Sequence, residues 1–364
     1  MAAPVDNRRR LSVRRRIIGV MAPVPPVTAA PAAATQAEGL PAAVQLARHR
    51  SVLPLGADAR VVGLDPETAL VVDGLPPPLA ALLDRLDRPS ATAALVAEAA
   101  AHGVPAEVAR GLLGQLVEAG ALVDAGRSAW VARARAVGVI SVRGRGPLAV
   151  GIVTGLLHSG VGTVHTDTGG TVRGADVGTG YVDADRGGER LTATQAAVRR
   201  LLPGAVTRAP PRRTRPDLVV LADEAPEPGV VDGLRASGVA HLAVRLRDGV
   251  GVVGPLVYPG RTACLGCLDL TRGDLEPRWP AVAAQLAGRA GVADPTTTTA
   301  TVGLAVAQAV AAIENTNPPA LGATLELDVE KGGLRRRPWS AHPDCPCGAG
   351  RAHPRHEETQ SRGE

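Results

Sequence analysis

Apolar strand patterns alternate with helical patterns over residues 136–256, and this alternation limits the fold of that region more than any other feature. VGVISVRG predicts a strand, PLAVGIVTGLLHSG a helix, VGTVHTD the next strand and TATQAAVRRLLP another helix. RPDLVVLAD then indicates a buried strand, followed by a short helix (VVDGLRASG) and a strand with a hairpin (AHLAVRLRDGVGVVGPLVYPG). Strands that alternate with helices predict an α/β domain built on a parallel, doubly wound sheet.

The turn between the first strand and the first helix of this region has the residues of a nucleotide-binding fingerprint. Gly144, Gly146 and Ala149 form a G-x-G-x-x-A turn, and Asp167 ends the next strand, 21 residues after Gly146 (167 − 146). Glycines allow a phosphate chain to approach the helix N-terminus, and an acid at this distance suits ribose hydroxyls. The pattern favours a nucleotide site, present or ancestral. The alternative is a glycine-rich turn that only packs the helix on the sheet.

The chain has four cysteines in two closely spaced pairs, Cys264 with Cys267 and Cys345 with Cys347. Two such pairs that join distant segments are typical of structural zinc, which takes four ligands in a tetrahedron. We therefore predict a zinc clasp between residues 258–270 and the C-terminal hairpin. The spacing between the two cysteines of the second pair is one residue shorter, so His342 is considered as a substitute ligand. Four reduced thiols and a redox C-x-x-C pair are the alternatives.

Residues 46–128 predict a second, smaller domain. Two short strand patterns (ARVVGL and ALVVDGL) precede three helical patterns and a last strand, ALVDAG, as in a winged helix-turn-helix. DNA binding is the usual function of that fold, and a winged-helix DNA-binding regulator is kept as an alternative. However, the third helix offers Glu107, Arg110, Gln115 and Glu118 as its polar groups, which is a poor set for reading phosphates. A peptide-binding winged helix fits these charges better.

Composition and charge limit the classes of partner. Residues 1–45 form a basic, Pro/Ala-rich tail and residues 349–364 a second tail, both expected to be disordered, and a linker is expected near 126–135. The net charge of +5 resides mostly in the first tail and in loops without aromatic residues, so nucleic acid is not an expected partner. Prolines 23, 25 and 26 interrupt the apolar helix that an export signal needs, and no segment predicts a membrane span. The expected location is cytoplasmic.

Several motifs occur together and in a defined order: the G-x-G opening, SGVGTVHTD, the DLVV strand, PGRTACLGCLDLTR and HPDCPCG. In this combination the chain resembles the ThiF/ubiquitin-activating-enzyme-like family, over about residues 50–348. Within that family it is most similar to the leader-peptide-binding partners of azole-peptide (TOMM) cyclodehydratases. The resemblance implies a ThiF-type, Rossmann-like sheet with its zinc clasp over residues 136–348, preceded by a winged helix that recognises a peptide.

The resemblance also implies a function. A leader peptide would add a strand to an edge of the small sheet near residues 60–75, with the third helix (105–119) as the other wall. The chain would be a scaffold that presents this precursor peptide to a YcaO-type ATP-dependent cyclodehydratase in modified-peptide (bacteriocin) biosynthesis. A homodimer is left open, because ThiF-like folds often dimerise. The residues implied for the nucleotide are Gly144, Gly146, Asp167 and Asp223.

Departures from the family pattern predict that catalysis is lost. Adenylating members resemble one another in an S-N-L-x-R-Q stretch and in a lysine on the next helix, whereas this chain has TGGTVRGADVGTG and RLTATQAAVRR there. Arg190 could neutralise phosphate charge without the geometry of a lysine, and Asp223 or Glu224 could hold magnesium. Because phosphoryl transfer depends on positioned cations, we predict a degenerate enzyme with no catalytic residue. An active ATP-dependent adenylyltransferase, with ATP and magnesium as cofactors, is the alternative. Three histidines are interpreted as packing or surface residues: His158, His165 and His241.

Overall fold

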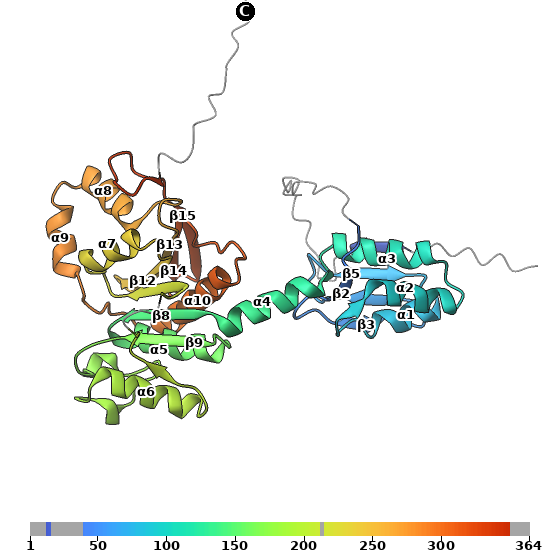
Figure 1. Ribbon diagram of the computed structural model, residues 1–364, viewed down its shortest axis with the longest axis horizontal. Helices are drawn as coiled ribbons and strands as arrows, with labels where there is room; N and C mark the ends of the chain where they lie inside the picture. The colour runs from blue at the N-terminus through green and yellow to red at the C-terminus, as the bar shows by residue number, and fades with distance from the viewer. Residues whose placement is uncertain (1–11, 16–38, 212–214, 350–364) are drawn as a thin grey trace, which may run out of the picture. The chain divides into compact units, whose positions relative to one another are not determined.

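The computed structural model describes residues 12–15, 39–211 and 215–349, which belong to two compact units, Met1–Val131 and Ala132–Glu364 (Figure 1). The tails expected at 1–45 and 349–364 lie mostly outside the described residues. Inside the first of them, however, Ser12–Arg15 forms β1 and Ala43–Leu46 forms β2. These two segments are strands and not disordered tail.

The larger unit is built on an eight-stranded sheet with the order β10-β9-β8-β11-β12-β13-β14-β15. The first five strands in this order run parallel to one another, and the last three are antiparallel to their neighbours. The α/β class predicted from the alternating pattern is thus confirmed. The strands are β8 (Val139–Gly144), β9 (Thr163–Asp167), β10 (Thr207–Arg208), β11 (Leu218–Ala222), β12 (His241–Arg247), β13 (Val250–Val257), β14 (Ala323–Asp328) and β15 (Gly333–Pro338).

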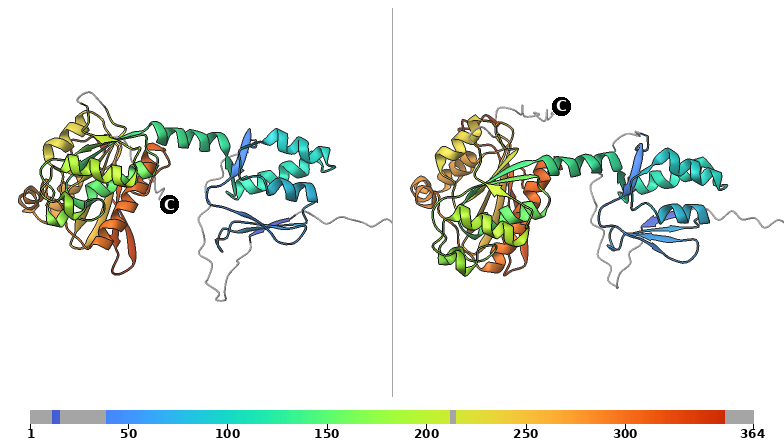
Figure 2. Two further views of the ribbon diagram at one scale, coloured as in Figure 1. Left: turned by 90° about the horizontal axis from the view of Figure 1, so that it is seen from below. Right: turned by 60° about the horizontal axis from the view of Figure 1, so that its bottom comes forward.

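Helices cover both faces of this sheet (Figure 2). Successive side chains of a strand point to opposite faces. Val220 therefore packs in the core formed with α5 and α10, whereas its neighbours Val219 and Leu221 pack against α7 and α8. The helices of this unit are α5 (Gly146–His158), α6 (Arg190–Leu201), α7 (Pro228–Ala236), α8 (Leu265–Leu275), α9 (Trp279–Leu286) and α10 (Pro295–Ile313).

Helix α10 is the one helix of the described ranges that is long and apolar enough to cross a membrane, by length and composition only. It packs on α5 and β13, and 44% of its apolar window is buried inside the protein. Asp294 caps its start, because Oδ1 accepts a hydrogen bond from the backbone N–H of Thr296 at 2.8 Å. Helix α10 is therefore a core helix of the larger unit.

The smaller unit contains two antiparallel sheets, with the orders β1-β5-β4-β3 and β6-β2-β7, and three helices packed into a Leu/Val/Ala core. As the sequence predicts, β4 and β5 precede the three helices and β7 follows them, while the winged helix-turn-helix itself stays a prediction. The further elements are β3 (Val52–Pro54), β4 (Arg60–Val62), β5 (Leu70–Asp73), α1 (Pro77–Leu83), β6 (Ser90–Ala91), α2 (Thr92–Ala101), α3 (Ala106–Glu118) and β7 (Leu122–Asp124).

The linker expected near residues 126–135 is instead a helix, α4 (Ala125–Val137). Its sequence, AGRSAWVARARAV, is rich in alanine and arginine, which are among the strongest helix formers. Only Ala125 is buried, so α4 lacks the apolar stripe by which an amphipathic helix is recognised.

Candidate metal centre and nucleotide crevice

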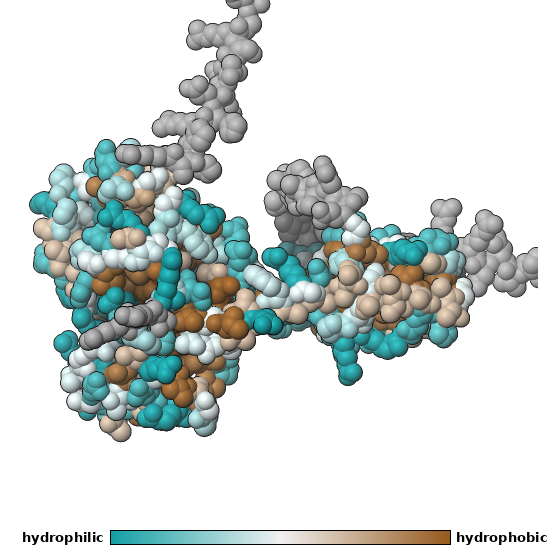
Figure 3. All heavy atoms as spheres, in the orientation of Figure 1, coloured by the Kyte–Doolittle hydropathy of each residue, from teal (hydrophilic) through white to brown (hydrophobic). Residues whose placement is uncertain are grey.

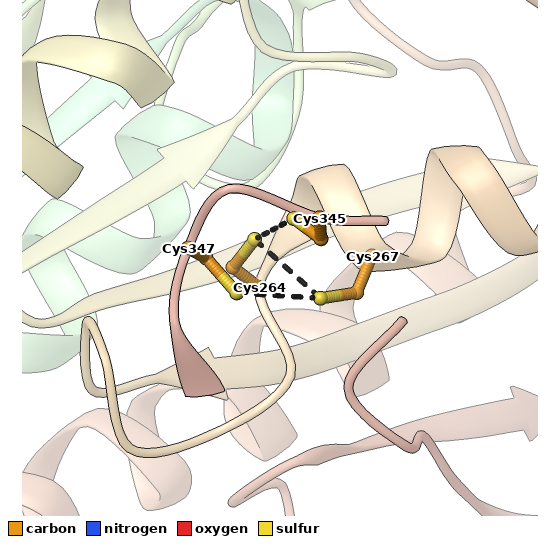
Figure 4. A group of neighbouring side chains, drawn as sticks. All are labelled: Cys264, Cys267, Cys345 and Cys347. Carbon is orange, nitrogen blue, oxygen red and sulfur yellow. Dashed lines mark hydrogen bonds between the residues drawn. The ribbon is translucent and has the colours of Figure 1, made fainter. Parts of the chain in front are cut away.

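The four cysteines come together in the larger unit, although 77 residues (345 − 267 − 1) separate the two pairs. Cys264 is the N-cap residue of α8 and Cys267 lies in the first turn of that helix. Cys345 and Cys347 lie in the segment that follows β15 and point toward the first pair (Figure 4). All four sulfur atoms lie within 4.8 Å of one another.

The separations between the sulfur atoms match those of a tetrahedral metal site. Sγ of Cys264 is 3.8 Å from Sγ of Cys267 and 3.6 Å from Sγ of Cys345, and Cys267 and Cys347 are 3.5 Å apart. Zinc–sulfur bonds of about 2.3 Å in a tetrahedron place the sulfurs about 3.8 Å apart. A disulfide needs about 2.05 Å, so the thiols are not bonded to one another. The cluster can hold one metal ion through four thiolates.

The surroundings of the cluster favour the protonated thiol at Cys264 and Cys345, whereas the pKa of Cys347 is lowered, because burial, which acts to raise it, is outweighed by hydrogen bonds with the backbone of Ala349 and with the other cysteines. Val257, Ala263 and Trp339 pack against the cysteines. Burial raises the pKa of the Cys264 thiol, and burial also raises the pKa of Cys345 to about 11. A metal ion must therefore displace protons when it binds, so binding weakens as the pH falls. Four thiolates favour a soft, tetrahedral ion such as Zn²⁺.

His342, the expected substitute ligand, lies outside this cluster. Its Nε2 is 2.9 Å from Oδ2 of Asp274 in α8, and its Nδ1 accepts a hydrogen bond from the backbone N–H of Asp344 at 3.2 Å. The histidine thus ties the cysteine-bearing segment to α8 through polar bonds and leaves the ligand positions to the four thiols.

The G-x-G turn lies where the connections of the sheet reverse direction. From β8 the chain passes to β9 and β10 on one side, and then to β11 and β12 on the other. Such a switch point is the usual ligand crevice of a doubly wound sheet. Gly144 ends β8 with φ 141° and Gly146 begins α5 with φ 81°, both positive. A Cβ on Gly144 would lie 2.8 Å from the backbone of Ala222, so only glycine fits there.

The two predicted acids lie at the same edge, and each has a protein partner. Oδ2 of Asp167 is 2.8 Å from Nε of Arg143. Oδ1 of Asp223 accepts a hydrogen bond from the backbone N–H of Arg145 at 3.1 Å, and burial raises the pKa of Asp223. In this arrangement Asp223 fastens the G-x-G turn to the end of β11.

A cavity of about 540 Å³ opens beside the turn, and its lining is basic. Asp176 is the single acid among its lining residues, against four arginines: Arg145, Arg173, Arg190 and Arg289. None of the four predicted nucleotide residues lines it. A Cβ on Gly146 would lie 3.0 Å from Cβ of Ala290, which belongs to the cavity wall. The structure brings the predicted residues to one edge of the sheet but not into one cavity.

Arg190, the arginine considered for phosphate, is already paired. Its Nη2 lies 2.6 Å from Oδ2 of Asp176, and the two side chains are 4% and 5% exposed. Nε of Arg190 donates to the carbonyl oxygen of Thr171 at 2.9 Å, while Nη1 has no partner among the described residues. Sequence reasoning missed Asp176, because it lies in a loop where the family pattern directs attention to Asn and Gln.

The edge of β5 in the smaller unit carries a strand from the same chain. β1 pairs antiparallel with β5, with Val13 opposite Val72 and Arg14 opposite Val71, while β4 pairs with the other side of β5. This edge belongs to the region near residues 60–75 where the sequence predicts peptide binding. The predicted second wall, α3, packs against α2 and β7.

No protein-family model matches the sequence, and no curated protein matches it. Solved structures match the fold. E. coli MccB with ATP aligns with a TM-score of 0.62 and 12% identity over 84% of this chain and 99% of that chain. The microcin C7 biosynthetic enzyme MccB in complex with N-formylated MccA gives 0.61 and 12% over the same shares. A heterocyclase in complex with substrate and cofactor gives 0.55 and 18%, over 84% of this chain and 40% of the heterocyclase chain. At these identities the likeness shows a shared α/β fold.

Proposed function

We propose that the chain is a ThiF-like scaffold that binds the leader of a precursor peptide at the edge of β5 and presents it to a YcaO-type ATP-dependent cyclodehydratase. The observation that carries this proposal is the pairing of β1 with β5. An edge that pairs with one extended segment offers the backbone groups that an added peptide strand needs, and strand addition is a common mode of peptide recognition.

The structural neighbours support the same assignment. The aligned part covers 99% of MccB, which has been solved with N-formylated MccA and is a biosynthetic enzyme of microcin C7. The heterocyclase has been solved with substrate and cofactor. In the proposal this chain also takes part in the biosynthesis of a modified peptide. It does so as a ThiF-like component that has no catalytic residues of its own.

In the proposal the four cysteines hold a structural zinc ion. Because they lie at the start of α8 and after β15, the metal would fasten the segment that follows β15 to α8. Four protein ligands leave no open coordination position, so the zinc would stabilise the fold and take no part in a reaction.

The second candidate function is an ATP-dependent adenylyltransferase, which the basic cavity beside the G-x-G turn favours. Two observations oppose it. Asp176 already neutralises Arg190. The single lysine, Lys331, lies in the turn between β14 and β15, where its Nζ is 2.7 Å from Oδ2 of Asp328. No lysine is therefore at hand to contact a phosphate at the crevice.

Calorimetric titration of the zinc-loaded protein with magnesium-ATP is expected to give no binding heat. The reason is that the polar groups at the crevice already have partners within the protein. Asp167 pairs with Arg143, Asp223 accepts a hydrogen bond from the G-x-G turn, and Arg190 pairs with Asp176. Micromolar binding that Asp167→Ala abolishes would instead favour the adenylyltransferase and direct work to its carboxyl substrate.

Removing residues 1–38 is expected to raise the affinity for a leader peptide, because β1 occupies the edge that the leader would use. If β1 holds the edge about nine-tenths of the time, its loss tightens apparent binding by about tenfold. The peptide to titrate would be the product of a short Cys/Ser/Thr-rich gene, to be sought beside this gene together with a YcaO-type gene, with fluorescence anisotropy as the readout.

The matched control for this truncation is Val52→Pro on β3, at the opposite edge of the same sheet. Proline is tolerated on an edge strand and blocks further pairing there. Val52→Pro should leave leader binding unchanged. If Val52→Pro weakens leader binding and the truncation leaves it unchanged, the leader binds at the β3 edge of the sheet and our proposal has the wrong edge.

A further inference from the structure

A groove runs across the face of the sheet that α7, α8 and α9 cover, away from α5 and α10. It consists of two hollows of about 490 and 580 Å³ that share lining residues, among them Val231, Asp269 and Trp279, so they form one groove. Apolar residues gather on this face in the region of α7 and β12 (Figure 3). The groove is separate from the basic cavity beside the G-x-G turn, with which it shares no lining residue.

Arg245 of β12 lines this groove as a buried cation that forms no ion pair with any described residue. Along β12, Val244 and Leu246 point into the core with α5 and α10, so Arg245 between them points to the other face. The residue is 7% exposed, and its Nη2 has no hydrogen-bond partner in the described part of the chain. Burial lowers the pKa of Arg245 to about 10, so the guanidinium is still charged at neutral pH. An uncompensated buried charge is strongly unfavourable.

The acids that line the same hollow are all engaged with other arginines. The pairs are Glu224 with Arg289 at 4.0 Å, Asp232 with Arg235 at 3.1 Å, Asp269 with Arg272 at 3.5 Å and Glu276 with Arg278 at 2.8 Å. Asp269 also accepts a hydrogen bond from Nε1 of Trp279 at 3.0 Å. Arg247 also lines this hollow and lies 3.8 Å from Glu326, a carboxylate that Arg335 and Arg337 also contact. Arg245 is thus the one arginine of this lining that has no ion pair with a described residue.

A second buried polar atom faces the groove in its other hollow. His241, on the same face of β12, is 1% exposed, and its Nδ1 lies 3.1 Å from the carbonyl oxygen of Val239. Nδ1 therefore donates, which leaves Nε2 as an acceptor, and Nε2 has no partner among the described residues. A ligand along the groove would meet an anion receptor at one end and a hydrogen-bond acceptor at the other.

We propose that this groove binds an organic carboxylate, with Arg245 as the receptor of the carboxylate group and the apolar walls around the rest of the ligand. The planar guanidinium matches a carboxylate in two parallel hydrogen bonds. A single carboxylate would supply the one negative partner that Arg245 lacks among the described residues, and the four nearby acids would repel a doubly charged phosphate. The mostly apolar lining suits a hydrocarbon or peptide body. This assignment does not depend on the proposed function.

Two pairs of probes test the proposal in the full chain by calorimetric titration at millimolar concentration. One pair is hexanoate and hexanamide; the other is a short apolar peptide with a free C-terminal carboxylate and the same peptide as its amide. We expect each carboxylate to bind at least tenfold more tightly than its amide, and Arg245→Met to abolish the difference. If the peptide acid binds more tightly than hexanoate, the carboxylate of the natural ligand is a peptide C-terminus. If hexanoate binds more tightly, the ligand is a free organic acid.

Arg199→Met serves as the control, because Arg199 is exposed on α6 and does not line the groove; it should leave these affinities unchanged. Binding that depends on neither the carboxylate nor Arg245 overturns the proposal, as does binding of inorganic phosphate without binding of either carboxylate.

Stability in the absence of any ligand gives an independent measurement. Arg245→Met should raise the melting temperature, because it replaces an unpaired buried charge by an apolar side chain of similar length. Arg245→Lys keeps the charge and loses the fork, so it should bind the carboxylates more weakly than the wild type without a gain in stability. A lower melting temperature for Arg245→Met would mean that the protein already satisfies this charge, and the proposal would fail.

Discussion

Cys264→Ser is expected to abolish binding of the zinc ion that we propose for the four cysteines and to lower the melting temperature of the protein by on the order of 10 °C. The Sγ atom of Cys264 lies 3.8 Å from that of Cys267 in its own pair and 3.6 Å from that of Cys345 in the other pair, so its loss removes one of the links between α8 and the segment after β15. A serine hydroxyl stays protonated at neutral pH and does not replace a thiolate as a zinc ligand. Elemental analysis of the purified protein and differential scanning calorimetry measure the two effects.

The matched control is His342→Gln, which breaks the contact with Asp274 in the same segment and removes no sulfur ligand. We expect this variant to retain its zinc and to lose only a few degrees. Unchanged metal content and unchanged stability in Cys264→Ser would contradict the structural zinc site. Equal losses in both variants would mean that the polar tether, and not the metal, holds the segment in place.

The larger fold was accessible from the sequence because its elements carry local signals. A run such as LVVLA, buried on both faces in β11, predicts a central parallel strand by itself. Helix α4 was missed for the opposite reason: only Ala125 is buried, and periodicity detects helices by their buried face. Helix propensity alone, from its alanines and arginines, was the signal that could have identified it.

The two candidate sites differ in how much the sequence could reveal. Two closely spaced cysteine pairs in a chain with only four cysteines are typical of few kinds of site, so their spacing already indicates a metal site. Arg245 gives no such signal, because an arginine in a strand is usually exposed. Residues of α8, which begins 20 residues further along the chain (265 − 245), and of α9 line the same hollow as Arg245. Only the assembled structure shows that this charge has no ion-pair partner among the residues it describes.

Asp176→Ala is expected to lower the free energy of unfolding by about 3–5 kcal/mol, the usual cost of breaking a buried ion pair from one side. The substitution leaves Arg190 charged and buried, with a single acceptor, the carbonyl oxygen of Thr171. It also removes the acceptor for the backbone N–H of Arg173, which donates to Oδ2 of Asp176 at 2.7 Å. Urea unfolding followed by circular dichroism measures the difference.

A double variant, Asp176→Leu with Arg190→Met, separates the effect of charge from the effect of packing. Replacing both members of a buried ion pair by apolar side chains is often neutral or stabilising, so this variant should recover most of the stability that Asp176→Ala loses. Equal losses in the single and the double variant would mean that the shape of the loop matters more than the charge of Arg190.

The single variant also tests whether the cavity binds anions. Once Asp176 is gone, Arg190 has lost its acidic partner and the lining holds four arginines and no acid, so the cavity becomes a better anion site than in the wild type. Inorganic phosphate should therefore raise the melting temperature of Asp176→Ala more than that of the wild-type protein. If phosphate stabilises the wild type just as strongly, Arg190 is available to anions despite its partner, and the case for a nucleotide in this crevice becomes correspondingly stronger.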